Sequence, residues 1–216
     1  MLKCRGVESS PPFADRGEAG CRLAAELPGL DRPIVLALPR GGVPVAAAVA
    51  RLIGAELDVF VVRKLGVPSQ PELAMGAVAS GGVRVLNEDV VHHAGVPPAV
   101  LEEVTARERA AVESREQLYR GDRPPVEIAA RNVVLVDDGL ATGATMRAAA
   151  AAVHALAPAR VVVAVPVAPA DVVDAFVRDG LEIVCVLVSG DFVSVGSWYR
   201  DFGQVTDDEV IRLIVG

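Results

Sequence analysis

The chain has 216 residues and a net charge of −7 at pH 7, which disfavours nucleic-acid binding because such proteins usually present a basic face. Its mean hydropathy of +0.41 is high, but its apolar residues fall in short runs that do not approach the roughly 18 residues of a membrane span. We therefore expect a cytoplasmic protein that binds neither nucleic acid nor a membrane.

The N-terminal residues 1–12 are expected to form a variable lead-in, and they contain no apolar core of the kind found in a signal peptide. Residues 13–216 are expected to form one domain. We divide that domain into a core over about residues 30–188, a flexible loop over residues 64–87 that interrupts it, and a small C-terminal hood over residues 189–216.

In the first half of the chain, short apolar runs alternate with segments of helical character. The predicted elements are a strand over residues 33–39, a helix over 42–53, a strand over 56–64 and a long helix over 97–120. The segment between the second strand and the long helix is rich in Gly and Pro. It contains two strand-like pieces around Gly81 and Gly82, so we expect a hairpin there.

The second half of the chain continues the alternation without interruption. The predicted elements are strands over residues 132–138, 160–167 and 181–188, with helices over 144–156 and 169–178 between them. All five strands are continuously apolar, which is typical of strands covered on both faces. The pattern predicts an α/β fold with a parallel five-stranded sheet flanked by helices.

The most informative stretch is "VVLVDDGLATGAT", residues 133–145. Asp137 and Asp138 stand at the carboxyl end of a buried strand, where ligands bind in open α/β sheets. The small residues that follow let backbone N–H groups approach an anion, and the next helix adds the positive end of its dipole. Because carboxylates accept hydrogen bonds from a diol while the loop suits phosphate, the stretch predicts a sugar-phosphate site.

This stretch resembles the phosphoribosyl pyrophosphate (PRPP) motif of type I phosphoribosyltransferases, and "DR.EAG", "PRGG", "RKLG", "PELAMGAV" and "SWY.DF" extend the resemblance to a bacterial branch of that family. The resemblance implies that Asp137 and Asp138 hold the ribose hydroxyls and lie near Mg²⁺. It also implies a loop for the 5-phosphate, which consists of Ala141, Thr142, Gly143, Ala144 and Thr145.

The resemblance assigns the remaining substrate contacts as well. Arg40, Gly41 and Gly42 would hold pyrophosphate, with a cis peptide bond expected at Arg40–Gly41. Arg63 and Lys64, at the root of a mobile catalytic loop, would neutralise the leaving group, although a surface pair at a strand end would look the same. Closing that loop would exclude water from the reaction.

The C-terminal hood would cover the acceptor base. Its aromatic residues include Phe192, Trp198, Tyr199 and Phe202, which either stack on a planar ring or only hold the tail against the core. Ala141 occupies the position at which the 6-oxopurine branch has a third Asp, so hypoxanthine or guanine is disfavoured as the acceptor. The base itself stays open.

The implied function is Mg²⁺-dependent phosphoribosyl transfer in nucleotide metabolism, between PRPP and a nitrogenous base or its nucleotide, with release of pyrophosphate. Because the family often dimerises, the resemblance also implies a homodimer. Two alternatives remain at this point: a non-catalytic regulator that senses PRPP or a nucleotide, and a phosphosugar hydrolase or phosphorylase.

Overall fold

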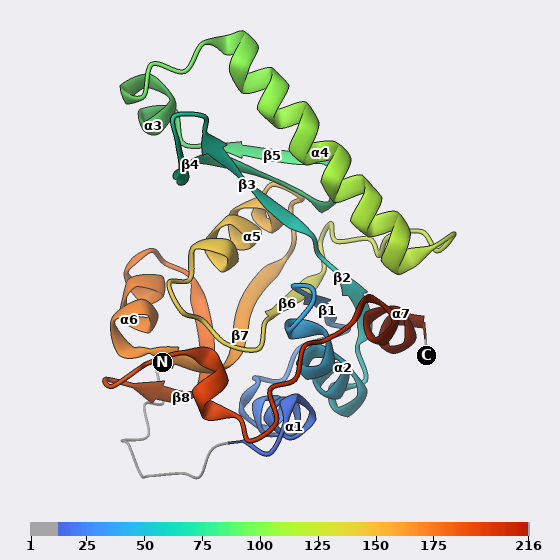
Figure 1. Ribbon diagram of the computed structural model, residues 1–216. Helices are drawn as coiled ribbons and strands as arrows, with labels where there is room; N and C mark the ends of the chain where they lie inside the picture. The colour runs from blue at the N-terminus through green and yellow to red at the C-terminus, as the bar shows by residue number, and fades with distance from the viewer. Residues whose placement is uncertain (1–12, 216) are drawn as a thin grey trace.

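The computed structural model describes residues 13–215, so the lead-in expected over residues 1–12 lies outside the described residues. At its centre is a five-stranded parallel sheet, which confirms the predicted fold class (Figure 1). The strands run in the spatial order β2 (Glu56–Val59), β1 (Ile34–Ala37), β6 (Asn132–Val136), β7 (Arg160–Pro169) and β8 (Glu182–Ser189).

Helices cover both faces of this sheet because its central strands are apolar on both sides. The first face carries α1 (Arg16–Glu26) and α2 (Gly42–Ile53), with α7 (Asp207–Val215) packed beside α2. The second face carries α5 (Ala144–His154) and α6 (Ala170–Arg178). Along β6, Val134 and Val136 face the first layer while Val133 and Leu135 face the second, as the pleat of a strand requires.

A second, antiparallel sheet stands above the first (Figure 1). It consists of β3 (Val62–Val67), β4 (Gln70–Ala79) and β5 (Val83–Leu86), and the last two are joined through the 3₁₀ turn η1 (Ser80–Gly82). Gly81 and Gly82 adopt φ values of +76° and +72° there, which glycine tolerates without steric cost. The hairpin expected around these two glycines is therefore confirmed.

One predicted strand has different bounds in the structure. Residues 56–64, expected as a single strand, divide into β2 in the parallel sheet and the first part of β3 in the antiparallel sheet. The division falls at Phe60 and Val61: the Phe60 amide still donates to Ala37 of β1 at 2.8 Å, whereas the Val61 carbonyl accepts the Ser80 amide at 2.9 Å. The chain thus changes sheets within two residues.

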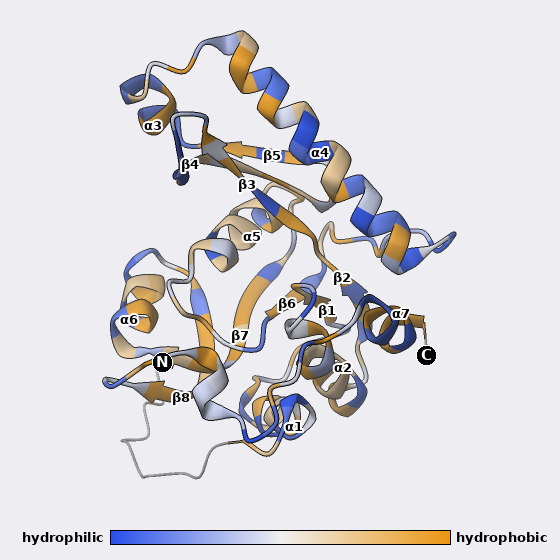
Figure 2. Ribbon diagram, in the orientation of Figure 1, coloured by the Kyte–Doolittle hydropathy of each residue, from blue (hydrophilic) through white to orange (hydrophobic). Residues whose placement is uncertain are grey.

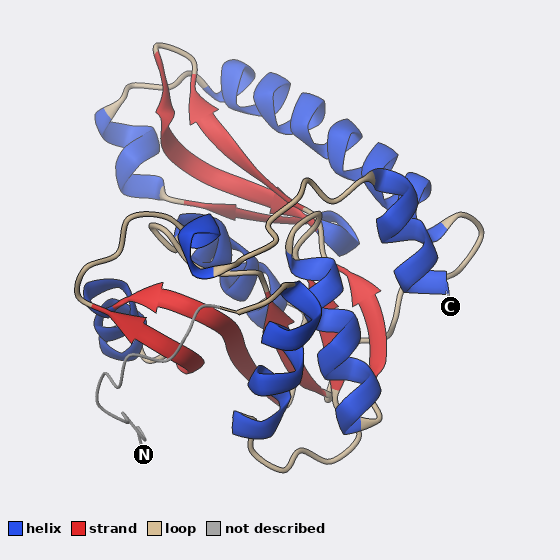
Figure 3. Ribbon diagram, turned by 60° about the horizontal axis from the view of Figure 1, so that its bottom comes forward, coloured by secondary structure: helices blue, strands red, loops and turns tan. Residues whose placement is uncertain are grey.

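The antiparallel sheet is covered on its outer side by the long helix α4 (Pro98–Arg120), which follows the short helix α3 (Glu88–His93). Figure 2 shows apolar and polar residues alternating along α4, as expected of a helix with one packed face. The view in Figure 3 shows α4 running along this sheet. None of the helices between residues 13 and 215 is long and apolar enough to cross a membrane.

The hood segment leaves β8, forms the 3₁₀ turn η2 (Val195–Trp198), crosses the first helical layer and ends in α7. It pairs with the beginning of the described chain: the Phe13 amide donates to the Trp198 carbonyl at 2.7 Å, and the Arg200 amide donates to the Phe13 carbonyl at 2.8 Å. The N-terminal and C-terminal segments therefore meet beside the carboxyl ends of the strands.

Candidate functional site

The sheet order places the candidate site. The chain order of the strands reverses between β1 and β6, and ligands of open α/β sheets bind beyond the carboxyl ends of the strands at such a switch point. The two strands end in register, with Ala37 opposite Val136. The segment after β1 carries Arg40, Gly41 and Gly42, and the segment after β6 begins with the acid pair, so the structure brings these predicted residues together.

The two glycines lie directly against the acid pair. A methyl group added at Gly41 would overlap the Oδ2 atom of Asp138, and one added at Gly42 would lie 2.8 Å from the Cα atom of Asp137 and the carbonyl oxygen of Val136. Only residues without a Cβ atom permit this approach. The expected cis peptide bond is present, but it joins Pro39 to Arg40, so the prediction of Arg40–Gly41 was wrong by one residue.

The acid pair is electrostatically unusual. The Asp138 amide donates to Oδ1 of Asp137 at 2.8 Å, which fixes the first carboxylate beside the second. Burial raises the pKa of Asp137 well above its ordinary value, and the neighbouring charge of Asp138 raises it further. Burial also raises the pKa of Asp138, although Arg16 opposes that effect. A cation or several hydroxyl donors placed against the pair would stabilise its ionised form.

Arg16 is the site residue that sequence reasoning did not assign. It is the first residue of α1, and its Nε and Nη2 atoms each lie 2.9 Å from Oδ2 of Asp138. The side chain is only 11% exposed. Its only signal in the sequence is the segment "DRGEAG", in which Asp15 caps the helix by accepting the Glu18 amide at 2.8 Å.

The small-residue loop after the acid pair leads into α5, as predicted. Gly143 is the N-cap residue with φ +72°, and a Cβ atom there would lie 2.6 Å from the ring of Phe176. Ala141, Thr142, Ala144 and Thr145 are exposed. The amides of the first turn of α5 thus face an open surface, beside which two hydroxyls are available.

Arg40 is held by the C-terminal helix. Its Nη1 atom lies 3.8 Å from the carboxylate of Asp207, the first residue of α7. Asp207 also accepts a hydrogen bond from the Tyr119 hydroxyl at 2.8 Å and from Arg115 at 3.0 Å. These bonds hold the pKa of Asp207 below its usual range, with the Tyr119 hydrogen bond as the largest cause.

Arg63 and Lys64 lie on opposite faces of the antiparallel sheet. Arg63 shares a face with Leu65, which packs in the cluster of α4, and its Nε donates to Glu108 of α4 at 3.0 Å. Lys64 shares a face with Val62, which packs in the cluster of α5. Lys64 therefore lies on the side of the helix that begins at the small-residue loop, whereas Arg63 is directed to the other side.

The hood aromatics divide into two groups. Phe192 and Trp198 stack on each other with ring centroids 6.5 Å apart. Tyr199 is buried, its hydroxyl donates to the backbone carbonyl of Asp138 at 2.5 Å, and its ring lies 5.4 Å from that of Phe13. Phe202 remains 37% exposed. The Phe202 ring lies 5.0 Å from the Tyr199 ring and 3.8 Å from the Arg16 guanidinium carbon, so it is only partly open.

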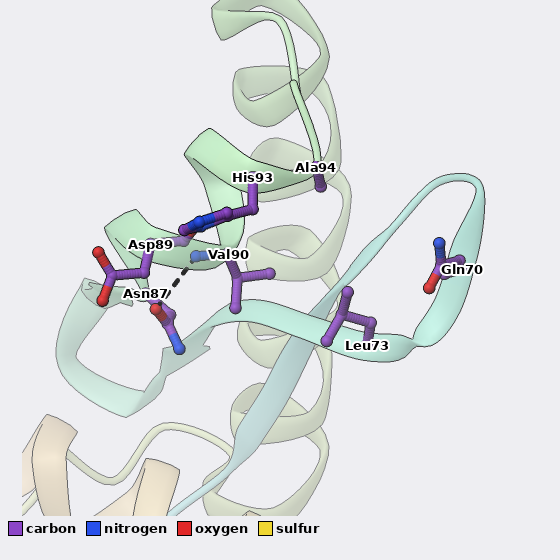
Figure 4. A pocket seen from close by; sticks show the side chains of 7 residues that line it. All are labelled: Gln70, Leu73, Asn87, Asp89, Val90, His93 and Ala94. Atoms are coloured by element: carbon purple, nitrogen blue, oxygen red, sulfur yellow. Dashed lines mark hydrogen bonds between the residues drawn. The ribbon is translucent and has the colours of Figure 1, made fainter.

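A separate hollow of about 370 Å³ lies between the turn of the β3–β4 hairpin and α3 (Figure 4). Its lining comprises Gln70, Leu73, Asn87, Asp89, Val90, His93 and Ala94. Asn87 accepts the Val90 amide at 3.2 Å, and His93 bonds to the Asp89 carbonyl at 2.6 Å, so these polar groups already serve the short helix. The converging charges and glycines of the strand ends are absent from this lining, and we place the functional site at the strand ends.

Comparison with known proteins shows the family of the chain. The family described as "Phosphoribosyl transferase domain" matches residues 21–175. "Putative phosphoribosyl transferase Rv0571c" and "Putative phosphoribosyl transferase MT0597", from two strains of Mycobacterium tuberculosis, are each 46% identical over 204 residues. Those residues are 94% of this chain and 46% of each relative, so the chain spans about half the length of these proteins.

Solved structures share the fold. The crystal structure of TT1426 from Thermus thermophilus is 47% identical, with a TM-score of 0.87 over 94% of this chain and 98% of that chain. A hypothetical protein from Neisseria gonorrhoeae, crystallised with bound ppGpp, covers 98% of both chains with a TM-score of 0.53 and 13% identity, which shows likeness of fold alone.

Proposed function

The chain belongs to the phosphoribosyl transferase domain family, and on that premise we propose that it transfers the phosphoribosyl group of PRPP to a nitrogenous base and releases pyrophosphate, with Mg²⁺ as cofactor. One observation carries the proposal. The ends of β1 and β6 bring the glycines of one loop against the two carboxylates that begin the other. Sites suited to an anion, a diol and a second anion are therefore contiguous.

Each part of PRPP has a matching group in this arrangement. The exposed first turn of α5, with Thr142 and Thr145, suits the 5-phosphate. The carboxylates of Asp137 and Asp138 suit the ribose hydroxyls, because ionised carboxylates are acceptors only. Arg40 and the Gly41 amide suit the pyrophosphate, which would compete with Asp207 for the Arg40 guanidinium. The Gly42 amide already donates to the Leu38 carbonyl at 3.1 Å, so Gly42 would serve the pyrophosphate by its lack of a side chain.

The donor set also fits Mg²⁺. Magnesium is usually held by one or two carboxylates together with substrate phosphates rather than by a cage of protein ligands. Asp137 and Asp138 supply such a pair, and residues 13–215 contain no group of three or more His, Cys, Asp or Glu side chains that could hold a metal alone. When bound, Mg²⁺ would supply charge stabilisation and a template for the pyrophosphate and ribose oxygens.

The reaction we propose is a displacement at the anomeric carbon. The bond from that carbon to the pyrophosphate oxygen breaks, a bond to a ring nitrogen of the base forms, and the proton of that nitrogen passes to the released pyrophosphate or to solvent. Arg40 and Lys64 would offset the negative charge that develops on the leaving oxygen. Arg63 contributes less in this proposal because its guanidinium is bound to Glu108 on the far side of the antiparallel sheet. Closure of the loop over residues 64–87 would exclude water.

The acceptor base is placed under the hood. The Tyr199 hydroxyl bonds the hood to the Asp138 carbonyl, and within the hood Phe192 stacks on Trp198. Phe202 is 37% exposed and would offer the base a stacking surface once the Arg16 guanidinium, 3.8 Å from its centroid, moves from the ring. Ala141 carries only a methyl group, so we propose no charged partner for a purine at that position.

The test is the release of pyrophosphate by purified protein with PRPP, Mg²⁺ and a broad panel of nitrogenous bases. The D137N/D138N double variant serves as the matched control, because it keeps the shape of the site and removes its charge. We expect release with at least one base in the wild type and none in the control. Binding of Mg·PRPP without turnover on any base would indicate a sensing regulator, and PRPP breakdown without a base would indicate a hydrolase.

A further inference from the structure

Arg16 connects the acid pair to the hood. Two of its nitrogens, Nε and Nη2, lie 2.9 Å from the same oxygen, Oδ2 of Asp138. A third nitrogen, Nη1, donates to the carbonyl of Gly203 at 2.9 Å, and the guanidinium carbon lies 3.8 Å from the ring centroid of Phe202. One largely buried side chain thus spans a carboxylate of the sugar site and two residues of the C-terminal tail.

The tail makes a second connection to the same acid. Tyr199, at the start of the segment of residues 199–206 that we call the tail strap, donates its hydroxyl to the backbone carbonyl of Asp138. The Arg16 guanidinium also lies 6.0 Å from the Tyr199 ring. Asp138 is therefore held by the tail strap through its backbone, and through Arg16 by its side chain. Any change at this carboxylate acts on groups that already contact the strap.

The charges indicate how ligand binding would change the bond between Arg16 and Asp138. In the proposed complex, ribose hydroxyls and a divalent cation approach the acid pair. Hydroxyl donors compete with Arg16 for the lone pairs of Oδ2, and a cation beside Asp138 repels the guanidinium. Both effects weaken the bond from Arg16 to Asp138 and leave Arg16 with the strap residues Phe202 and Gly203 alone.

We propose that Arg16 is a positioning residue that couples occupancy of the sugar-phosphate site to the conformation of the tail strap. In the free protein it ties the strap to Asp138. When Mg·PRPP binds at Asp138, Arg16 shifts with the strap, which rearranges around the acceptor base. This inference rests on the proposed function, because it needs Mg·PRPP at the acid pair.

The chain contains its own reporter of this movement. Trp198 is the only tryptophan of the sequence, and it immediately precedes the tail strap. Its Nε1 is buried without a hydrogen-bond partner among the described residues. Its fluorescence therefore reports on the hood without an added label.

The experiment compares the wild type with R16M, R16K and R22M. Arg22 is the matched control: it also lies on α1 and stacks on a hood-contacting ring, at 4.6 Å from the centroid of Phe13, but its contact is with Phe13 rather than Asp138. Each protein is titrated with Mg·PRPP by calorimetry and by Trp198 fluorescence, and kcat and KM are measured with an accepted base. If R16M does not fold, R16K carries the test.

For the wild type and R22M we expect binding and a change in Trp198 emission. For R16M we expect a Kd within about tenfold of the wild type, loss of the emission change, and a fall in kcat with little change in the KM for PRPP. Lysine keeps the charge and one donor group, so R16K should recover part of both signals.

Three results overturn the coupling alone: a wild type that binds Mg·PRPP with no change in emission, an R16M variant that keeps the full emission change and kcat, or Mg·PRPP binding that is lost in both Arg16 variants. A wild type that does not bind Mg·PRPP at all overturns the proposed function, and this inference with it.

Discussion

Replacing Gly41 with alanine should separate the function of the site from the stability of the fold. Gly41 has φ −60° and ψ −35°, which alanine adopts freely, so the backbone imposes no penalty. The new methyl group would instead overlap Oδ2 of Asp138, the oxygen that Arg16 contacts. That oxygen is the end of a side chain, so the carboxylate rotates away and the strands stay in place.

The size of the effect follows from the hydrogen bonds lost. A hydrogen bond to a charged group contributes about 1.5–3 kcal/mol, so misplacing one carboxylate oxygen should weaken Mg·PRPP binding roughly 10- to 150-fold. G42A is the matched comparison. Its methyl group would lie 2.8 Å from backbone atoms of Val136 and Asp137, which cannot rotate away. Overpacking of this kind costs about 1–3 kcal/mol of unfolding free energy.

Calorimetry with Mg·PRPP and chemical denaturation of both variants decide the matter. We expect G41A to lose affinity with a smaller loss of unfolding free energy than G42A, because only the side-chain bonds of Asp138 are disturbed. The reasoning is refuted if folded G41A binds Mg·PRPP as tightly as the wild type, or if the two variants lose equal stability.

Three further variants test other parts of the account. K64A should lower kcat roughly 100-fold, whereas R63A should change it little because Arg63 is bound to Glu108; equal effects in steady-state assays would contradict this assignment. D58A should cost about 1.5–3 kcal/mol in urea unfolding, because Arg120 loses the buried carboxylate that accepts from its Nε and keeps only Glu116 and the Val59 carbonyl; a smaller loss would show that water reaches the pair. Asp207 has a depressed pKa, so its stabilisation is present above the unfolded-state value of about 3.9 and is lost as the pH falls through the folded-state value. In D207N the unfolding free energy should therefore fall less steeply as the pH is lowered below about 4. An unchanged pH dependence would show that Asp207 does not contribute to acid unfolding.

Local sequence signals predicted much of the architecture. The helix predicted over residues 42–53 has those bounds in the structure, because glycines stand at both of its ends and Gly54 closes it with φ +66°. The turn from β6 through the small-residue loop into α5 was also predicted, since an apolar run ends at charges and a helix follows. Both features are set by residues that are neighbours in the sequence, which is why local patterns predict them.

The sequence could not show where the chain changes sheets. The run "ELDVFVVRK" is continuously apolar from Val59 to Val62, and it has no Gly or Pro at Phe60 or Val61 to mark a break. The division there depends on partners elsewhere, namely Ala37 and Ser80. The helices α1 and α7 were also not predicted, although each has a start signal: Asp15 accepts the Glu18 amide and Thr206 accepts the Glu209 amide.

The long-range contacts of the site were the least predictable part. Arg16 and Asp138 are separated by 122 positions, and no local pattern identifies one as the partner of the other. The opposite directions of Arg63 and Lys64 follow from the pleat, but the face that each takes depends on how α4 and α5 pack. The position of the cis peptide bond, at Pro39–Arg40, likewise had to come from the structure.

The central claim is that the acid pair at the end of β6 holds the sugar of PRPP. The most direct measurement is a calorimetric titration of Mg·PRPP into the wild type and into D137N/D138N, with melting temperatures measured alongside. We predict saturable binding by the wild type and none by the double variant, which should stay folded. Equal affinity in the two folded proteins would contradict the account.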